Sequence, residues 1–324
     1  MKHILIIQTA YIGDVILATS LIESLIRKDA SLKIDFLLRK GNEGLLDGHP
    51  HINELFVWDK NNRKYKNLFQ TVKAIRKNKY DALLNLQRFA SSGYFSWRAK
   101  AVVKVGFKQN PFSFSYKHKV RHKMEKGVHE IERNHALLKE LGDFDLEKPV
   151  LYPYKTDLDK AREIAGEKKL IVMAPASVWF TKQLPKEKWI TVIKQYSNAH
   201  RIVLIGGKND EMYLQEILFS CPDNDIVNLA GELSLLESVA LISLAEMTHA
   251  NDSAPLHMAS AVNAPITAYF CSTIPDFGFG PLSDEQQIKE TTEELPCRPC
   301  GLHGKKACPE GHFKCALSVD VTIS

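Results

Sequence analysis

The stretch Met1–Ser20, MKHILIIQTAYIGDVILATS, contains the pattern that decides the fold. Its apolar run His3–Gln8 has the length of a buried strand, and the segment from Asp14 places apolar residues on one helical face. A basic residue before an apolar stretch also mimics a signal peptide, but Gln8, Thr9 and Asp14 interrupt this one. We therefore predict a strand, a turn and a helix without an export signal, and a cytoplasmic protein.

The same alternation of strand-length apolar runs and amphipathic segments continues along the whole chain. In the first half we expect further strands at Lys33–Leu38, Leu55–Trp58, Asp81–Leu86 and Val102–Gly106, and helices at Leu68–Lys77 and Glu130–Leu141. In the second half we expect strands at Leu170–Ala174, Arg201–Gly206, Asp225–Leu229, Met247–Ala250 and, as the last, Pro265–Cys271, with helices from Lys186, Asp210 and Leu235. Strands that alternate with helices predict βαβ units and parallel sheets.

A domain boundary is expected where the alternation pauses. The stretch Pro149–Lys169 contains two prolines followed by a polar helical segment. The 324 residues therefore divide into two Rossmann-like, doubly wound α/β domains, 1–152 and 153–324. Ligands of such sheets bind outside the carboxyl ends of the strands, so two domains facing a cleft would each hold one ligand.

The charge of the chain is unevenly distributed. Residues 1–150 have a net charge of +11 and the remainder −6, which gives +5 overall. A basic first half indicates an anionic partner: a phosphorylated glycan, a membrane surface or nucleic acid. A lysine-rich solvated surface without a partner explains the same charge. No apolar run approaches the roughly 18–20 residues that span a bilayer.

The first candidate site follows the first expected strand. Gly13 would allow a tight turn close to a ligand, and Asp14 would open the helix. A carboxylate at this place is either a plain helix cap or a general base that accepts a proton from an attacking hydroxyl.

The second candidate site is the loop Ala174–Pro185, after the first strand of the second domain. Ser177, Thr181 and Lys182 can supply hydroxyls and a cation to a diphosphate. The loop is not a P-loop, because GxxxxGK[ST] is absent.

The third candidate site lies around the helix start after Met247–Ala250. Asp252 and Ser253 precede a proline and are either caps or part of a phosphate-binding helix N-terminus. His257 is either a packed side chain or a donor contact. Glu237, in the preceding helix, is either helix surface or a carboxylate for ribose hydroxyls.

Two patterns raise the question of a metal. Cys297, Cys300, Cys308 and Cys315, with His303 and His312 nearby, have a spacing that suits zinc or an iron–sulfur cluster, or else reduced thiols or local disulfides. Three Asp-x-Asp triplets, Asp143/Asp145, Asp157/Asp159 and Asp223/Asp225, are better explained as solvated charge. We expect no catalytic metal and no cofactor.

Together, the candidate segments resemble the ADP-heptose:lipopolysaccharide heptosyltransferases, glycosyltransferase family 9. The resemblance covers essentially the whole chain and rests on IGDVILATSLIESL (12–25), PASVWFTKQLPKEKW (175–189) and LSLLESVALISLAEMTHANDSAPLHMASAVNAP (233–265). It implies a GT-B fold and an inverting transfer without a metal. The implied donor is ADP-L-glycero-D-manno-heptose, and the implied acceptor is a heptose or Kdo hydroxyl of the lipopolysaccharide inner core.

The resemblance also assigns roles to residues. Asp14 matches the family's base, and Lys182 the lysine that steadies the donor phosphates. The remaining donor contacts that it implies are Ser177, Glu237 and Asp252, to which we add Thr181, Ser253 and His257. The sequence departs from the family at Gln8, Leu184 and Ala254, where arginine, tryptophan and glycine are usual.

The candidate acceptor contacts lie in the first half of the chain. Gly13, Lys119 and Arg121 are candidate acceptor contacts, the last two within the basic stretch Lys117–Lys123 that would meet an anionic acceptor at the inner membrane face. Alternative functions are a GT-B transferase with another nucleotide sugar or a protein acceptor, a sugar-nucleotide epimerase, and a nucleic-acid-binding protein. The last lacks a recognisable nucleic-acid-binding motif, so no nucleic acid is expected.

Overall fold

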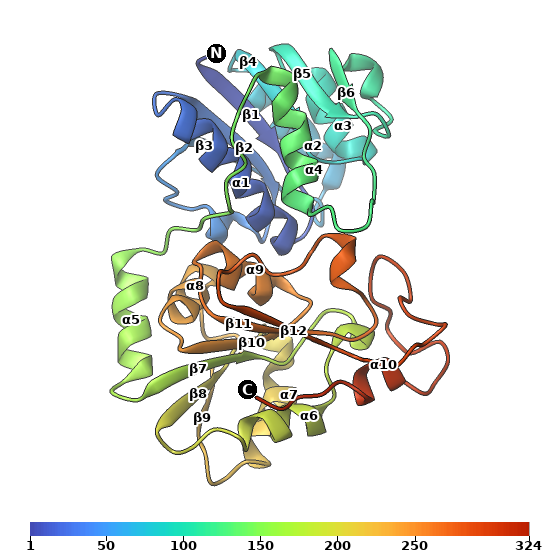
Figure 1. Cartoon of the computed structure of the whole chain (residues 1–324). Coiled ribbons are helices and arrows are strands. Elements are labelled where there is room, and N and C mark those ends of the chain that lie inside the picture. The colour runs from blue at the N-terminus through green and yellow to red at the C-terminus, as the bar shows by residue number, and fades with distance from the viewer. Residues whose placement is uncertain (324) are drawn as a thin grey trace. The chain divides into compact units, whose positions relative to one another are not determined.

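The computed structural model describes residues 1–323 and divides the chain into two compact units (Figure 1). Unit 1 comprises Met1–Tyr152, and unit 2 begins at Pro153. Each unit has its own parallel six-stranded sheet and its own core. Within residues 1–323, no helix is both long enough and apolar enough to cross a membrane.

The sheet of unit 1 has the strand order β3-β2-β1-β4-β5-β6, and all its pairs are parallel. Its strands are β1 (His3–Ile7), β2 (Lys33–Arg39), β3 (Ile52–Trp58), β4 (Tyr80–Asn85), β5 (Ala101–Phe107) and β6 (His118–Val120). The helices are α1 (Ile12–Lys28), α2 (Lys64–Ile75), α3 (Ala90–Arg98) and α4 (Glu130–Leu138), with short 3-10 turns η1 (Glu43–Leu45), η2 (Ser113–Ser115) and η3 (Lys139–Leu141).

The sheet of unit 2 repeats this topology, with the order β12-β11-β10-β7-β8-β9. Its strands are β7 (Lys169–Ala174), β8 (His200–Leu204), β9 (Asp225–Asn228), β10 (Met247–Asn251), β11 (Ile266–Phe270) and β12 (Gln286–Glu290). The helices are α5 (Lys155–Ala165), α6 (Lys186–Ile193), α7 (Glu211–Phe219), α8 (Leu235–Ser243), α9 (Ala254–Ala261) and α10 (Lys314–Leu317), with 3-10 turns η4 (Phe180–Lys182), η5 (Lys208–Asp210) and η6 (Pro275–Phe277).

The central strands of both sheets are buried on their two faces. Ile4 to Ile7 of β1 and Ile171 to Met173 of β7 are fully buried, as expected for parallel strands covered by helices on each side. Burial of these apolar runs is the main stabilising contribution to each core. The sequence-based prediction of two doubly wound α/β units is therefore confirmed.

Two local predictions are wrong. Pro265–Cys271 does not hold the last strand, because β12 follows it and pairs in parallel with β11. This edge strand, QQIKE, is largely polar and partly exposed, so it has no apolar run that a sequence pattern could detect. Gly13 does not form a tight turn either, because α1 already begins at Ile12 and the φ angle of Gly13 is not positive.

Each sheet has one point at which the strand order reverses. In unit 1 it lies between β1 and β4, and in unit 2 between β7 and β10. At such a switch point the loops after the two strands run in opposite directions and leave a crevice where ligands of this fold bind. Asp14 follows β1, Lys182 follows β7 and Asp252 follows β10, which places these three candidate residues at the two switch points. Glu237 lies instead in α8, which follows β9.

Candidate functional site

The switch point of unit 2 is built around Asn251, the last residue of β10. Its fully buried side-chain amide donates to the carbonyl of Pro175 at 2.7 Å, and its Oδ1 accepts the N–H of Leu184 at 2.9 Å. One side chain thereby holds both ends of the loop that follows β7. Leu184 is fully buried in the core of this unit.

Lys182 and Asp252 meet across this switch point. The Lys182 Nζ lies 2.6 Å from Asp252 Oδ2, and both side chains are largely buried. The hydroxyl of Thr273 donates to the same carboxylate oxygen at 2.6 Å. The predicted cation and the predicted carboxylate therefore form one ion pair, positioned by turn η4 on one side and by β10 on the other.

Two further predicted donor residues lie around this pair. Ser253 is the N-cap of α9 and its side chain makes no capping hydrogen bond. Ser177 is partly exposed in the loop after β7, and its carbonyl accepts from the Gln183 amide at 2.6 Å. Both serines therefore border the crevice. His257 is buried in α9 and its ring contacts Phe279 edge-on at a centroid distance of 6.4 Å, which is the packed arrangement.

Glu237 occupies the first turn of α8. Its Oε1 lies 2.8 Å from the Lys160 Nζ, and its Oε2 accepts the N–H of Ser234. Partial burial acts to raise the pKa of Glu237, but the hydrogen bonds from Lys160 and Ser234 outweigh it and lower the pKa. The carboxylate is therefore ionised at neutral pH, and its remaining lone pairs can accept two hydroxyls.

Thr181 is buried, unlike the exposed hydroxyl that its loop position suggests. Its Oγ1 accepts from the Ser272 hydroxyl at 3.0 Å and from the Lys305 N–H at 2.8 Å, and its own N–H donates to the Lys305 carbonyl. The hydroxyl is engaged within the protein, which argues against its predicted contact with a donor.

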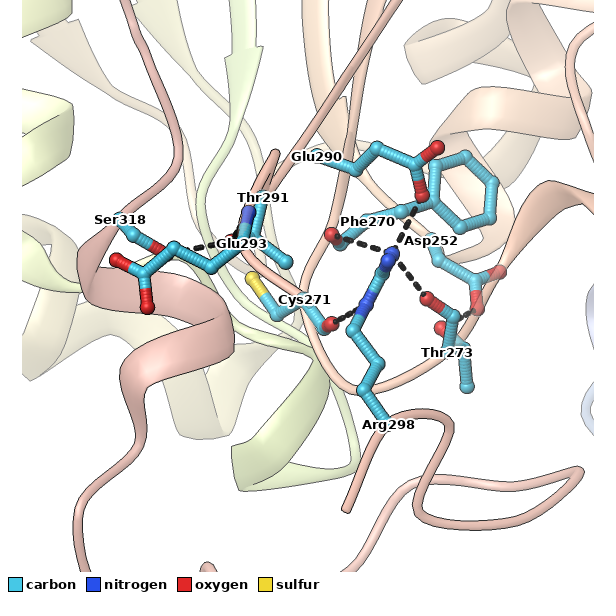
Figure 2. Close-up of polar contacts among 9 residues, drawn as sticks. All are labelled: Asp252, Phe270, Cys271, Thr273, Glu290, Thr291, Glu293, Arg298 and Ser318. Carbon is cyan, nitrogen blue, oxygen red and sulfur yellow. Dashed lines mark hydrogen bonds and ion pairs between the residues drawn. The ribbon is translucent and has the colours of Figure 1, made fainter. Parts of the chain in front are cut away.

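Arg298, in the segment after β12, contacts the end of β11 and the residues that follow it (Figure 2). The guanidinium donates to the carbonyls of Cys271 at 2.7 Å, Thr273 at 2.8 Å and Phe270 at 3.4 Å, and it pairs with Glu290. These carbonyls lie at the last residue of β11 and directly after it, in the segment that supplies the hydroxyl bound to the Asp252 carboxylate. Sequence analysis missed Arg298 because no pattern around it indicates what it contacts.

The same C-terminal segment also packs on the Lys182 loop. A Cβ added at Gly304 would lie 2.4 Å from Cβ of Trp179 and 2.9 Å from Cγ of Lys182. The rings of Phe180 and Phe313 stack with centroids 5.1 Å apart. The C-terminal segment thus packs against the loop that carries Lys182, and the glycine at position 304 permits this close contact.

Replacing Arg298 by Met should lower the free energy of unfolding by about 2–3 kcal/mol, because three carbonyls and Glu290 lose a charged donor. Arg298→Lys should be intermediate, since a single ammonium cannot reproduce the planar fork of donors. Chemical denaturation measures both. Arg162→Met, which removes an exposed ion pair with Asp159, is the matched control and should stay within about 0.5 kcal/mol. Equal effects of the two Met variants would contradict the role of Arg298.

The four C-terminal cysteines are free thiols in this structure. Burial, followed by the proximity of Cys300 and Cys308, raises the pKa of Cys315 to about 11. The Sγ of Cys297 lies 3.8 Å from His312 Nε2. Within residues 1–323, no three His, Cys, Asp or Glu side chains are grouped so that they could hold a metal ion.

Asp14 lies in the first turn of α1, the helix that follows β1 in unit 1. Its Oδ2 accepts the N–H of Tyr11 at 3.2 Å, so it contributes to the start of the helix. Across the switch point, Gln8 and Gln87 are buried and joined by a hydrogen bond between their side chains. Gln8 therefore closes the base of this crevice.

A group of charged residues that the sequence did not single out lies near the start of α4, and one of them, Glu130, interacts electrostatically with Asp14. Glu130 is buried at the start of α4, and Arg133 Nε donates to it at 2.6 Å. Burial raises the pKa of Glu130; Arg133 and Arg88 oppose this rise, and the charge of Asp14 adds to it. Burial, then Arg88 and Arg133, lower the pKa of His122 to about 4. Carboxylate and guanidinium groups therefore lie close together near the start of α4.

Lys119 and Arg121 are exposed, the first within the edge strand β6 and the second just after it. Part of the basic stretch Lys117–Lys123 is therefore a strand. No described contact joins either side chain to Asp14, so their role as acceptor contacts stays a prediction.

Two consecutive doubly wound units, each with a reversed strand order and polar groups at its switch point, are the architecture of the GT-B fold. Solved structures share this fold. The chain has a TM-score of 0.77 to the Escherichia coli ADP-heptose lipopolysaccharide heptosyltransferase II, at 22% identity over 93% of this chain and 96% of that chain. For a family 9 glycosyltransferase of Veillonella parvula the TM-score is 0.79, at 22% identity over 89% and 85% of the two chains.

Residues 68–309 match glycosyltransferase family 9 (heptosyltransferase), so the chain belongs to this family and is a glycosyltransferase. Among curated relatives, the lipopolysaccharide heptosyltransferase 3 of Escherichia coli is 29% identical over 81% of both chains. The lipooligosaccharide heptosyltransferase 2 of Haemophilus influenzae is 25% identical over 99% of this chain and 96% of its own.

Proposed function

We propose that the protein transfers heptose from ADP-L-glycero-D-manno-heptose to a heptose or Kdo hydroxyl of the lipopolysaccharide inner core, with inversion at the anomeric carbon. The observation that carries the proposal is the buried Lys182–Asp252 pair at the switch point of a family 9 unit. Relatives named lipopolysaccharide heptosyltransferases, and the Escherichia coli enzyme WaaC solved with ADP and with ADP-2-deoxy-2-fluoro heptose, support this choice of donor and acceptor.

Unit 2 would hold the donor. Lys182, the Ser177 hydroxyl and the backbone N–H groups at the start of α9 would stabilise the charge that develops on the diphosphate. Asp252 positions Lys182, and Glu237, itself positioned by Lys160, would accept the ribose hydroxyls. Such preorganised groups contribute about 10²–10³-fold each, so the reaction has no need of a divalent cation.

Unit 1 would hold the acceptor and activate it. Asp14 would take the proton of the acceptor hydroxyl while its oxygen forms a bond to the anomeric carbon, and the bond from that carbon to the β-phosphate oxygen breaks. The exposed Arg88 would be a cation for the anionic groups of the inner core. The protein would act in the cytoplasm, peripherally at the inner face of the membrane.

The test of the proposal is product formation. The purified protein is incubated with ADP-heptose, UDP-sugars or GDP-sugars and a series of truncated lipopolysaccharide acceptors. We expect one added heptose, seen by mass spectrometry, with ADP-heptose alone. Transfer from a UDP- or GDP-sugar in preference to ADP-heptose would point to the other donors, and conversion of the donor without any acceptor would point to an epimerase.

Chelation should leave this transfer intact. Lys182 and the N-terminus of α9 would offset the diphosphate charge that metal-dependent transferases neutralise with a divalent ion. Asp159 and Asp225 of the Asp-x-Asp triplets pair instead with Arg162 and Lys168. The measurement is turnover after EDTA, with circular dichroism recorded on the same sample. Lost activity with an unchanged spectrum, restored by Mg²⁺ or Mn²⁺, would refute the metal-independent mechanism.

A further inference from the structure

Unit 1 has a continuous group of aromatic rings that the proposed reaction does not use. Three segments contribute: α2, α3 and the region of turn η2. The aromatic ladder comprises Phe69, Tyr94, Trp97, Phe112 and Phe114. Neighbouring rings lie 5.8–6.4 Å apart between centroids, so the five side chains form one patch rather than scattered contacts.

Much of this ladder faces solvent. Phe69 is 57% exposed, Trp97 41% and Phe114 66%. A single exposed apolar side chain is normal on a protein surface, whereas a contiguous exposed group marks a place where a partner binds.

The ladder lies in the most basic part of the chain. Residues 60–124 contain 17 Lys and Arg but one acidic residue, Asp81. This stretch has a larger net positive charge than unit 1 as a whole. Its partner is therefore anionic as well as able to accept aromatic side chains.

Several of these cations lie directly beside the rings. Lys66 and Lys73 are three residues before and four residues after Phe69 on the exposed face of α2, so all three share one helix face. The guanidinium of Arg98 lies over the Trp97 ring at 5.2 Å, and Lys104 Nζ donates to the Trp97 carbonyl at 3.0 Å. Among the described residues 1–323, no ion pair joins Lys66, Lys73 or Arg98 to a carboxylate.

We propose that the aromatic ladder and the cations beside it form the surface by which this protein docks on a bilayer that contains anionic lipid. Aromatic rings insert at the level of the lipid headgroups, while Lys and Arg at their rim meet the negative surface. Each such cation adds about fivefold to the binding constant. The inference rests on the proposed function in one respect, since a lipid-anchored acceptor requires an enzyme at the membrane.

The ring geometry favours a bilayer over nucleic acid. Proteins bind single-stranded nucleic acid by stacking bases on open ring faces. In the ladder, the Phe69–Tyr94, Tyr94–Phe112 and Tyr94–Trp97 pairs meet at 80°, 79° and 63°, while the Trp97–Phe112 and Phe112–Phe114 pairs are tilted by 31° and 38°. Because neighbouring rings contact one another in different orientations, they form no row of parallel, open faces for successive bases. A compact wedge of this kind fits between lipid headgroups.

Co-sedimentation with vesicles tests the proposal. Vesicles of phosphatidylcholine with about 30% phosphatidylglycerol should bind the wild-type protein at least tenfold more tightly than pure phosphatidylcholine vesicles, because each cation beside the ladder raises the binding constant several-fold.

The variants test the two parts of the surface separately. Phe69→Ser/Phe114→Ser should lower the binding to anionic vesicles about tenfold, since two exposed rings lose their apolar contact. Lys66→Gln/Lys73→Gln keeps the rings and should lower the binding about 25-fold, because two cations of about fivefold each are lost. Phe219→Ser, at an equally exposed phenylalanine of unit 2, is the control and should bind as the wild type does.

Three outcomes would overturn the proposal. Equal binding to both kinds of vesicle removes the role of charge, and equal loss in the Phe219 variant removes the role of the ladder. An oligonucleotide that binds more tightly than the vesicles, through the same four residues, would identify nucleic acid instead. Transfer to a delipidated, soluble acceptor should be unchanged in all variants. A wild-type protein that docks on vesicles but transfers no heptose would defeat the proposed function and leave the docking surface standing.

Discussion

Replacing Asp14 by Asn should lower the turnover number by about 10²–10⁴-fold, the range that a positioned general base contributes. The substitution keeps the size of the side chain and retains one oxygen, so the hydrogen bond from the Tyr11 N–H that starts α1 can persist. What disappears is the ability to accept a proton from the acceptor hydroxyl. The affinity for ADP, a ligand proposed to bind unit 2, should remain within about twofold.

A matched aspartate outside the candidate site serves as the control. Asp47, an exposed aspartate of unit 1 outside the switch point, is changed to Asn in parallel and should keep its activity. Turnover is measured at saturating donor and acceptor, and ADP affinity by calorimetry. If the Asp14 variant keeps a third or more of the wild-type turnover, Asp14 is a helix cap and not the base.

Replacing Lys182 by Met should lower kcat/KM for the donor by about 10²–10³-fold, the loss typical of one group that stabilises charge in the transition state. Part of any loss could instead arise because the buried Asp252 carboxylate is left without its cation, which destabilises a fold by a few kcal/mol. The two causes predict different behaviour in a second variant.

The double variant Lys182→Met/Asp252→Asn separates these causes. Removing both charges should restore most of the lost thermal stability, because no uncompensated charge remains buried. Donor use should stay low, since the phosphate-binding cation is still missing. A double variant that regains transfer along with stability would show that Lys182 is structural.

The sequence predicted the elements well where their pattern is local. The apolar run of β1 and the amphipathic face of α1 depend on residues a few positions apart, and both are found within a residue or two of the expected limits. The polar strand β12 shows the limit of this reasoning: it forms because β11 offers an unpaired edge, a condition that its own five residues do not express.

For the candidate site, too, the sequence predicted individual residues but not the contacts between them. Lys182 and Asp252 were identified separately, each because it follows a strand and the carboxyl ends of parallel strands share one edge. Their direct pairing at 2.6 Å, and the Thr273 hydroxyl on the same carboxylate, are not visible in either loop alone. Thr181 is the converse case: its position in the loop suggested an available hydroxyl, but the tertiary contacts with Ser272 and Lys305 occupy it.

The sequence by itself thus determined the strand and helix order, the two doubly wound units, and the edges at which polar residues gather, because periodicity and strand ends are local properties. Only the tertiary structure decided which of these side chains touch. Arg298 reaches the carbonyls after β11 from a segment without periodicity, and the aromatic ladder joins residues up to 45 positions apart. Contacts of this kind depend on how the elements pack, which no short stretch of sequence encodes.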